Sequence, residues 1–156
     1  MRVHVCAVGR LRPGPERDLV DDYVSRFGRV GRQLGLGPAQ IKEIDDRKGG
    51  GISAEAALID RAIPDGAATV ALDERGKVMT SPDFAAMLAR WRDEGVADAA
   101  LVIGGADGLD PELRQRADVR LSLGPMVWPH MLVRVMLAEQ LYRAASILAS
   151  SPYHRA

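Results

Sequence analysis

Backbone atoms that grip a small ligand are the first chemistry that this sequence indicates. The apolar run Ala99–Ile103 leads directly into Gly104-Gly105-Ala106-Asp107-Gly108. Glycine permits positive φ and lets a ligand approach the main chain closely. The same pattern is typical of a tight turn between a strand and a helix, so both interpretations stay open. The motif is not a P-loop, because no Gly-Lys-Ser/Thr follows, and its late position before a short helix makes it a poor dinucleotide fingerprint.

A second loop, Ser122–His130, combines two prolines, a tryptophan and a methionine where a polar turn would be ordinary. Such a loop is stiff and presents backbone N–H and C=O groups beside an apolar wall. This combination suits an adenine ring, which needs hydrogen bonds at its edge and an apolar slot for its faces. The alternative is that the loop packs into the core or forms an oligomer interface. Ligand binding and such a structural role can also occur together.

The chain finishes on Tyr153-His154-Arg155, an aromatic and basic tail suited to contact with nucleic acid. The net charge is zero, with 21 basic and 21 acidic residues, which argues against a generic nucleic-acid binder. The distribution is uneven, because residues 119–156 contain four arginines and a single acid, Glu139. Most basic residues are arginine, the side chain better suited to bidentate phosphate contacts. A general compositional bias toward arginine and alanine explains much of the high arginine content. It does not explain why the charge is unevenly distributed along the chain.

Other kinds of active site are not indicated. His4, His130 and His154 have no metal-ligand spacing with one another or with Cys6, and no Ser-His-Asp or Cys-His arrangement stands out. Cys6 lies inside an apolar run, which favours a buried strand residue over a nucleophile. No stretch approaches the roughly 18 apolar residues of a membrane span, and no secretion signal is recognisable. We therefore expect a cytoplasmic protein that holds no metal.

Strand and helix patterns alternate along the chain, and these elements must position the two loops. Their order favours an α/β fold with a mostly parallel sheet and helices on both faces, as a single domain over residues 1–156. We expect strands at residues 2–8, 41–44, 68–72, 99–103 and 119–123, with a turn at 73–76. We expect helices at residues 16–30, 53–63 with Ser53 as the cap, from Ser81-Pro82 onward, 110–117 and 131–149.

Ligands of such sheets bind beyond the carboxyl ends of the strands. Leu72, Gly104-Gly105 and Gly124-Pro125 each follow a strand, so we expect three loops to meet at one edge of the sheet. The last helix is apolar nearly all round, which predicts burial on more than one side, most simply by a second subunit. Glu139 and Arg143 are spaced for an i,i+4 ion pair, for which a structural role is favoured over a catalytic one.

Five motifs resemble one known family along the whole chain. They are VHVCAVG at 3–9, LDERGK at 72–77, IGGADGL at 103–109, PHMLVRVMLAEQLYRA at 129–144 and PYHR at 152–155. The sequence is similar to the large-subunit (23S) rRNA pseudouridine N3-methyltransferase H family of the SPOUT class. The two C-terminal motifs are long and specific. Two departures stand out, because Ala106-Asp107 replaces a common Pro-Glu, and the loop at 124–128 lacks the usual Ser, Ala and Thr.

The resemblance implies a C-terminal trefoil knot that binds S-adenosylmethionine, a homodimer, and methylation of N3 of a pseudouridine in the rRNA of assembled ribosomes. The cofactor residues that it implies are Leu72, Gly105, Gly124, Pro125, Met126, Val127, Trp128 and Pro129. The substrate-binding residues that it implies are Arg143, Tyr153, His154 and Arg155. Arg143 and His154 are the catalytic candidates, expected to orient the base and stabilise its developing negative charge. His154 is alternatively the general base.

Two other functions stay open at this point. One is a SPOUT methyltransferase that acts on another RNA, such as tRNA, although the PYHR ending argues against it. The other is a non-catalytic module that binds the ribosome without the cofactor. A nicotinamide-dependent enzyme is remote, because no early strand–GxGxxG–helix unit exists.

Overall fold

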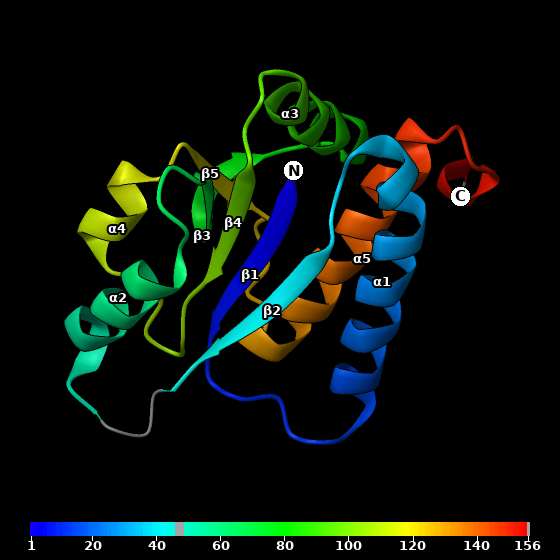
Figure 1. Ribbon diagram of the computed structural model, residues 1–156. Coiled ribbons are helices and arrows are strands. Elements are labelled where there is room, and N and C mark those ends of the chain that lie inside the picture. The colour runs from blue at the N-terminus through cyan, green and yellow to red at the C-terminus, as the bar shows by residue number, and fades with distance from the viewer. Residues whose placement is uncertain (46–48, 156) are drawn as a thin grey trace.

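The computed structural model describes residues 1–45 and 49–155, with the backbone alone for residues 154 and 155. Its centre is a five-stranded sheet in the order β2-β1-β4-β3-β5, with every neighbouring pair parallel (Figure 1). The strands are β1 (Arg2–Val8), β2 (Ala39–Ile44), β3 (Ala68–Val78), β4 (Asp98–Ile103) and β5 (Val119–Ser122). The prediction of an α/β fold with a parallel sheet is confirmed. The C-terminal knot that the resemblance implies stays a prediction.

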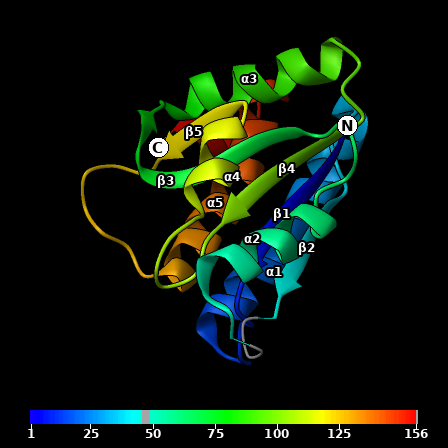
Figure 2. The same ribbon diagram turned by 90° about the vertical axis from the view of Figure 1, so that its left-hand side faces the viewer.

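Helices cover both faces of the sheet (Figures 1 and 2). One face packs against α1 (Pro15–Gly31), α3 (Ser81–Asp93) and α5 (His130–Leu148). The other packs against α2 (Gly51–Ala62) and α4 (Pro111–Arg116). Two short 3₁₀ helices follow α1 and α5, η1 (Arg32–Leu34) and η2 (Pro152–Arg155). In the described part of the chain, no helix is both long and apolar enough to cross a membrane.

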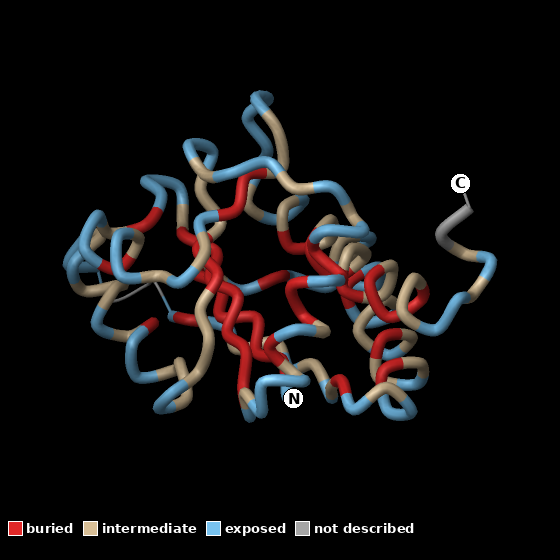
Figure 3. The backbone as a smooth tube through the Cα atoms, turned by 90° about the horizontal axis from the view of Figure 1, so that it is seen from above, coloured by how far each residue is buried: buried red, intermediate tan, exposed pale blue. Residues whose placement is uncertain are grey.

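The strands at the centre of the sheet are the most deeply buried elements (Figure 3). Every residue of β4 is buried, as expected for a strand covered on both faces. Cys6 of β1 is completely buried on the side of α2, and this burial raises the pKa of its thiol to about 11. The thiol is therefore protonated at neutral pH, which confirms that Cys6 is an inert core residue.

Helix α2 begins earlier than the sequence indicates. Ser53 does not cap it, because the helix already begins at Gly51 after Gly50, whose φ of 100° makes a left-handed turn into it. Ser53 therefore lies inside the first turn. Helix α3 begins at Ser81, as predicted, and Thr80 caps it, since its hydroxyl accepts a hydrogen bond from the Asp83 N–H at 3.2 Å. Asp110 caps α4 as predicted, through its carboxylate.

Strand β3 is longer than the sequence indicates, since it continues to Val78. Both Leu72 and Lys77 pair with Leu121 of β5, so residues 73–76 leave the ladder and the strand then resumes. Gly76 makes this return possible, because a Cβ there would lie 2.7 Å from the backbone of Arg120. The predicted turn at 73–76 is therefore an excursion inside one strand, and its residues reach the sheet edge where the loops meet.

A buried guanidinium ties the start of α5 to the ends of β1 and β2. Arg134 is 1% exposed, and its Nη2 donates to the carbonyls of Val8 at 3.2 Å and Gly9 at 3.1 Å. Its Nη1 lies 3.3 Å from the carboxylate of Glu43. Burial lowers the pKa of Arg134, while Glu43 acts in the opposite direction. The ion pair and the two carbonyls offset part of the desolvation of this charge, and Nε of Arg134 is buried with no hydrogen-bond partner among the described residues.

Replacing Arg134 by methionine should lower the free energy of unfolding by about 3 kcal/mol, because the carbonyls of Val8 and Gly9 and the carboxylate of Glu43 each lose a donor. Urea denaturation followed by circular dichroism measures the change. Arg10→Met is the matched control, since Arg10 pairs with the same carboxylate at 3.5 Å but its side chain is 79% exposed. Equal losses for the two variants would contradict the role given to Arg134.

Candidate functional site

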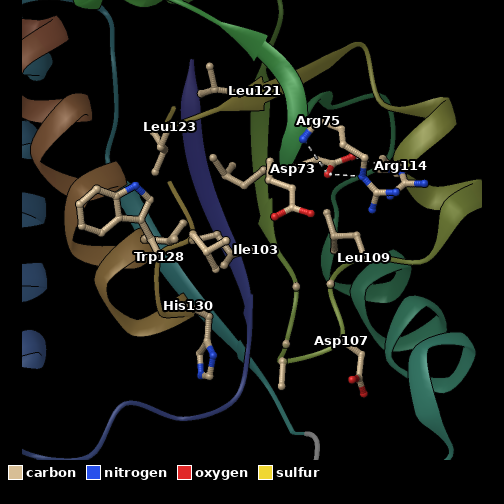
Figure 4. Close-up of a pocket in the computed structure, with 18 of the residues that line it drawn as sticks. Asp73, Arg75, Ile103, Asp107, Leu109, Arg114, Leu121, Leu123, Trp128 and His130 are labelled. Carbon is tan, nitrogen blue, oxygen red and sulfur yellow. Dashed lines mark hydrogen bonds and ion pairs between the residues drawn. The ribbon is translucent and has the colours of Figure 1, made fainter. Parts of the chain in front are cut away.

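The carboxyl ends of β4, β3 and β5 are neighbours, so the three loops meet at one edge of the sheet, as the sequence predicts. They enclose a cleft of about 320 Å³, which the start of α5 borders with His130 and Val133 (Figure 4). Its other walls come from the β3 excursion, the glycine turn after β4 and the loop after β5. Of the predicted cofactor residues, the following line it: Leu72, Gly105, Gly124, Met126, Val127 and Trp128.

The glycine turn after β4 is required by close packing of its own chain. A Cβ on Gly104 would lie 2.5 Å from the carbonyl oxygen of Gly108, and Gly108 itself has a φ of 81°. The Gly108 N–H donates to the carbonyl of Gly105 at 3.1 Å, which closes the turn. A side chain at Gly105 would meet Val8 at 3.1 Å. The tight turn is therefore confirmed, and it also forms the backbone rim of the cleft, while ligand binding by this rim stays a prediction.

The loop after β5 lies on the surface and not in the core. Met126 is 67% exposed, Val127 82% and Trp128 38%. Ser122 fixes its start, because the hydroxyl accepts from the Gly124 N–H at 3.2 Å and donates to the Gly124 carbonyl at 3.1 Å. Pro125 and Pro129 flank the cleft-lining residues without lining the cleft themselves, and Pro129 caps α5. Core packing of this loop is therefore excluded, which leaves ligand binding and a subunit interface.

A buried carboxylate forms part of the cleft wall that sequence analysis did not single out. The side chain of Asp73 is 7% exposed and lies 3.2 Å from Nε of Arg114 and 3.4 Å from Nε of Arg75 (Figure 4). The Arg75 N–H also donates to it at 3.2 Å. These contacts fix the β3 excursion against α4. Only the LDERGK motif hinted at this residue, and nothing in the sequence indicated Arg114 as its partner.

The tail and the end of α5 form a second cluster. The predicted ion pair exists, with Nη2 of Arg143 2.7 Å from Glu139, and the Tyr153 hydroxyl donates to the same carboxylate at 3.1 Å. The Arg143 guanidinium lies 5.0 Å from the centre of the Tyr153 ring. The centre of the Tyr142 ring lies 4.5 Å from the centre of the Tyr153 ring. Partial burial and hydrogen bonding raise the pKa of Tyr153, so it is a neutral phenol at neutral pH. The side chains of His154 and Arg155 lie outside the described residues.

The cleft and the tail cluster lie at opposite ends of α5 in one chain (Figure 1). His130 begins the helix and Tyr153 follows its end, and the 19 residues of the helix span about 28 Å at the usual rise. The structure therefore brings most of the predicted cofactor residues together, and it brings Arg143 to Tyr153. It does not bring these two groups to each other within one chain. Among the residues whose side chains the structure describes, 1–45 and 49–153, no group of three His, Cys, Asp or Glu residues could hold a metal ion.

Residues 1–154 match a family model described as "Predicted SPOUT methyltransferase". The chain belongs to this family. Two relatives named ribosomal RNA large subunit methyltransferase H, from Roseobacter denitrificans and Cereibacter sphaeroides, are 70% and 68% identical to it over 155 residues. Each alignment covers 99% of this chain and 99% of the relative. The resemblance drawn from the five motifs is therefore confirmed.

Solved structures resemble this SPOUT methyltransferase at low sequence identity. A probable methylase family protein from Haemophilus influenzae has a TM-score of 0.57 at 14% identity, covering 97% of this chain and 69% of that one. A probable methyltransferase from Bordetella pertussis has a TM-score of 0.52 at 16% identity, covering 92% and 94%. At these identities the likeness shows the fold alone, in agreement with the family.

Gly104→Ala should destabilise this SPOUT methyltransferase by about 1–3 kcal/mol, because the new methyl group meets a backbone carbonyl that cannot move without opening the turn. Gly28→Ala is the control with the opposite sign. A Cβ at Gly28, inside α1, meets nothing within 4 Å, so alanine should stabilise the helix by about 0.5–1 kcal/mol. Thermal unfolding of both variants measures the difference. A stable Gly104→Ala protein would show that the turn can relax.

Proposed function

We propose that this protein transfers a methyl group from S-adenosylmethionine to N3 of a pseudouridine in the 23S rRNA of assembled ribosomes in the cytoplasm. The observation that carries the proposal is a cleft at three adjacent strand ends, in a chain 70% identical to a protein named ribosomal RNA large subunit methyltransferase H. Action on tRNA, or ribosome binding without catalysis, is not favoured, because that name specifies both ribosomal RNA and methyl transfer.

The residues of the cleft fit S-adenosylmethionine, which joins an adenine ring to a ribose and a cationic sulfonium. Gly105 and Gly124 line the cleft without side chains, Trp128 and Leu121 offer apolar surface, and the carboxylates of Asp73, Glu74 and Asp107 outnumber the two arginines of the lining, Arg75 and Arg114. When bound, the cofactor supplies an electrophilic methyl group. The residues that would hold it are Leu72, Gly105, Gly124, Met126, Val127 and Trp128, while Pro125 and Pro129 stiffen the loop.

The tail residues act on the nucleoside. Methyl transfer to N3 replaces its imide proton, so the tail residues would have to favour loss of that proton, to His154 or to solvent, and stabilise the charge left on the base. Arg143 stabilises the negative charge that develops on the base, and its pairing with Glu139 raises its pKa and keeps it cationic. Tyr153 donates a hydrogen bond as a neutral phenol. His154 orients the base or accepts the proton, and Arg155 contacts phosphate.

The tail of a second copy completes each cleft, because a chain's own tail lies a helix length away from it. A homodimer meets this requirement with two identical sites. Apolar side chains beside the cleft offer a surface for the second copy, since these are exposed: Met126, Val127, Trp128, Met131 and Leu132. Covering them with a partner removes apolar area from water and stabilises the assembly.

Arg143→Ala and His154→Ala should each lower kcat for methylation of ribosomes that lack the modification by about 100-fold, because each removes stabilisation of the transition state. The dissociation constant of S-adenosylmethionine, measured by calorimetry, should stay near that of the wild type. Arg61→Ala, an exposed arginine of α2, controls for the loss of one positive charge. Near-normal turnover by both tail variants would remove Arg143 and His154 from the mechanism.

Mixing two inactive variants tests whether the tail acts across the dimer. One variant, Gly105→Phe, fills the cleft, and the other, Arg143→Ala/His154→Ala, lacks the tail groups. Random pairing should restore about a quarter of the wild-type sites, because half of the dimers are mixed and each mixed dimer has one complete site. Mass spectrometry of the rRNA measures the methyl group gained. No recovery from the mixture, with dimers verified, means that the tail acts within its own chain.

A further inference from the structure

The C-terminal half of α1 carries unpaired positive charge that neither the cleft nor the tail uses. Residues 23–41 contain three arginines, Arg26, Arg29 and Arg32, and no acid. The acids of the helix lie in its first half, at Glu16, Asp18, Asp21 and Asp22. The helix is therefore divided into an acidic start and a basic end.

Two of these arginines are free to bind a ligand. Arg29 and Arg32 are exposed, and neither side chain has a hydrogen bond or ion pair with any residue in the described part of the chain. Arg26 differs, because its Nη2 lies 2.9 Å from the carboxylate of Asp22. Its guanidinium carbon lies 5.8 Å from the centre of the Tyr142 ring. A cation in the last turn also stabilises its own helix, but that effect is small and explains Arg29 alone.

The free arginines border a groove between α1 and the chain that leads into β2. The groove has a volume of about 820 Å³, and we call it the basic groove. Gly28 leaves its wall open, since a Cβ there would meet nothing within 4 Å. The described residues that line it include no acid, and they are Met1, Val24, Ser25, Gly28, Arg29, Arg32, Gln33 and residues 35–39. A concave surface with arginine, serine and glutamine donors and no carboxylate favours a phosphate ligand.

Helices α1 and α5 run in the same direction, so the end of α1 that borders the basic groove and the tail lie at the same end of this pair (Figure 1). Aromatic rings connect α1 to the tail, because the centre of the Tyr142 ring lies 6.3 Å from that of Tyr23 and 4.5 Å from that of Tyr153. The groove lies on another face of α1, with Arg29 in its last turn and Arg32 directly after it. Whatever brings the tail to a partner's cleft therefore also brings this end of α1 toward the same cleft.

We propose that the basic groove binds the phosphate backbone of the rRNA next to the nucleotide that is methylated, through Arg29 and Arg32. The inference rests on the proposed function, since it assigns to the subunit that donates the tail a second contact with the same RNA. Phosphate contacts hold a nucleic acid in register without reading its sequence. The groove thus positions the target nucleotide, and the tail acts on it.

Arg29→Ala/Arg32→Ala should weaken binding to ribosomes about tenfold and lower the slope of log K against log salt by about one to two. KM for ribosomes should rise, while kcat at saturation and the affinity for S-adenosylmethionine stay unchanged. Arg29→Lys/Arg32→Lys should restore most of the affinity, because a point charge still binds phosphate. Arg61→Ala/Arg116→Ala, on the opposite face of the sheet, removes the same charge and should leave the salt slope unchanged.

A photo-crosslinking residue at Gln33, inside the groove, identifies what lies there. A crosslink to 23S rRNA supports the proposal, and a crosslink to a ribosomal protein overturns it. Unchanged affinity and salt slope in the Arg29→Ala/Arg32→Ala protein also overturn it, provided that the wild type methylates ribosomes. A wild type that neither binds nor methylates ribosomes instead contradicts the proposed function, so the two failures are distinguishable.

Discussion

The buried charge of Arg134 ties α5 to the sheet, and α5 in turn carries one wall of the cleft at its start and Arg143 near its end. Its guanidinium binds the carbonyls at the end of β1 and the carboxylate of Glu43 on β2. A charge with 1% exposure tolerates little displacement from these partners. The first turn of α5 is thus held at the carboxyl edge of the sheet, where His130 borders the cleft. The other end of the same rigid helix carries Arg143 and leads into the tail.

Local charge, and not net charge, is what this fold offers to a nucleic acid. The chain has a formal charge of zero, yet its charges are unevenly distributed. The lining of the cleft mixes the carboxylates of Asp73, Glu74 and Asp107 with Arg75 and Arg114, whereas the lining of the basic groove has Arg29 and Arg32 and no acid. Because screening limits exposed charges to about 10 Å at ordinary salt, two regions a helix length apart act independently.

Sequence patterns predicted the parts of this molecule that depend on short-range rules. Alternation of strands and helices predicted the parallel sheet, and Asp110-Pro111 predicted the start of α4. The excursion of β3 could not be predicted, because it depends on the close approach of Gly76 to the backbone of Arg120, 44 positions away along the chain. The partners of Asp73 and Arg134 could not be predicted for the same reason, since an ion pair between distant parts of the chain leaves no periodic pattern in the sequence. The prediction that Ser53 caps α2 was wrong, because a residue that is favourable as a cap does not prevent the helix from beginning earlier in the chain.

The separation of cleft and tail gives the length of α5 a role in the proposed dimer. The cleft borders the first residues of α5, and the tail follows the end of this 19-residue helix. In the proposed twofold pairing each tail meets the other subunit's cleft, and the basic groove contacts the RNA beyond the methylated nucleotide. The length of α5 would then fix which residues of the two subunits meet, so shortening that helix by a turn would misalign the site even if both halves folded normally.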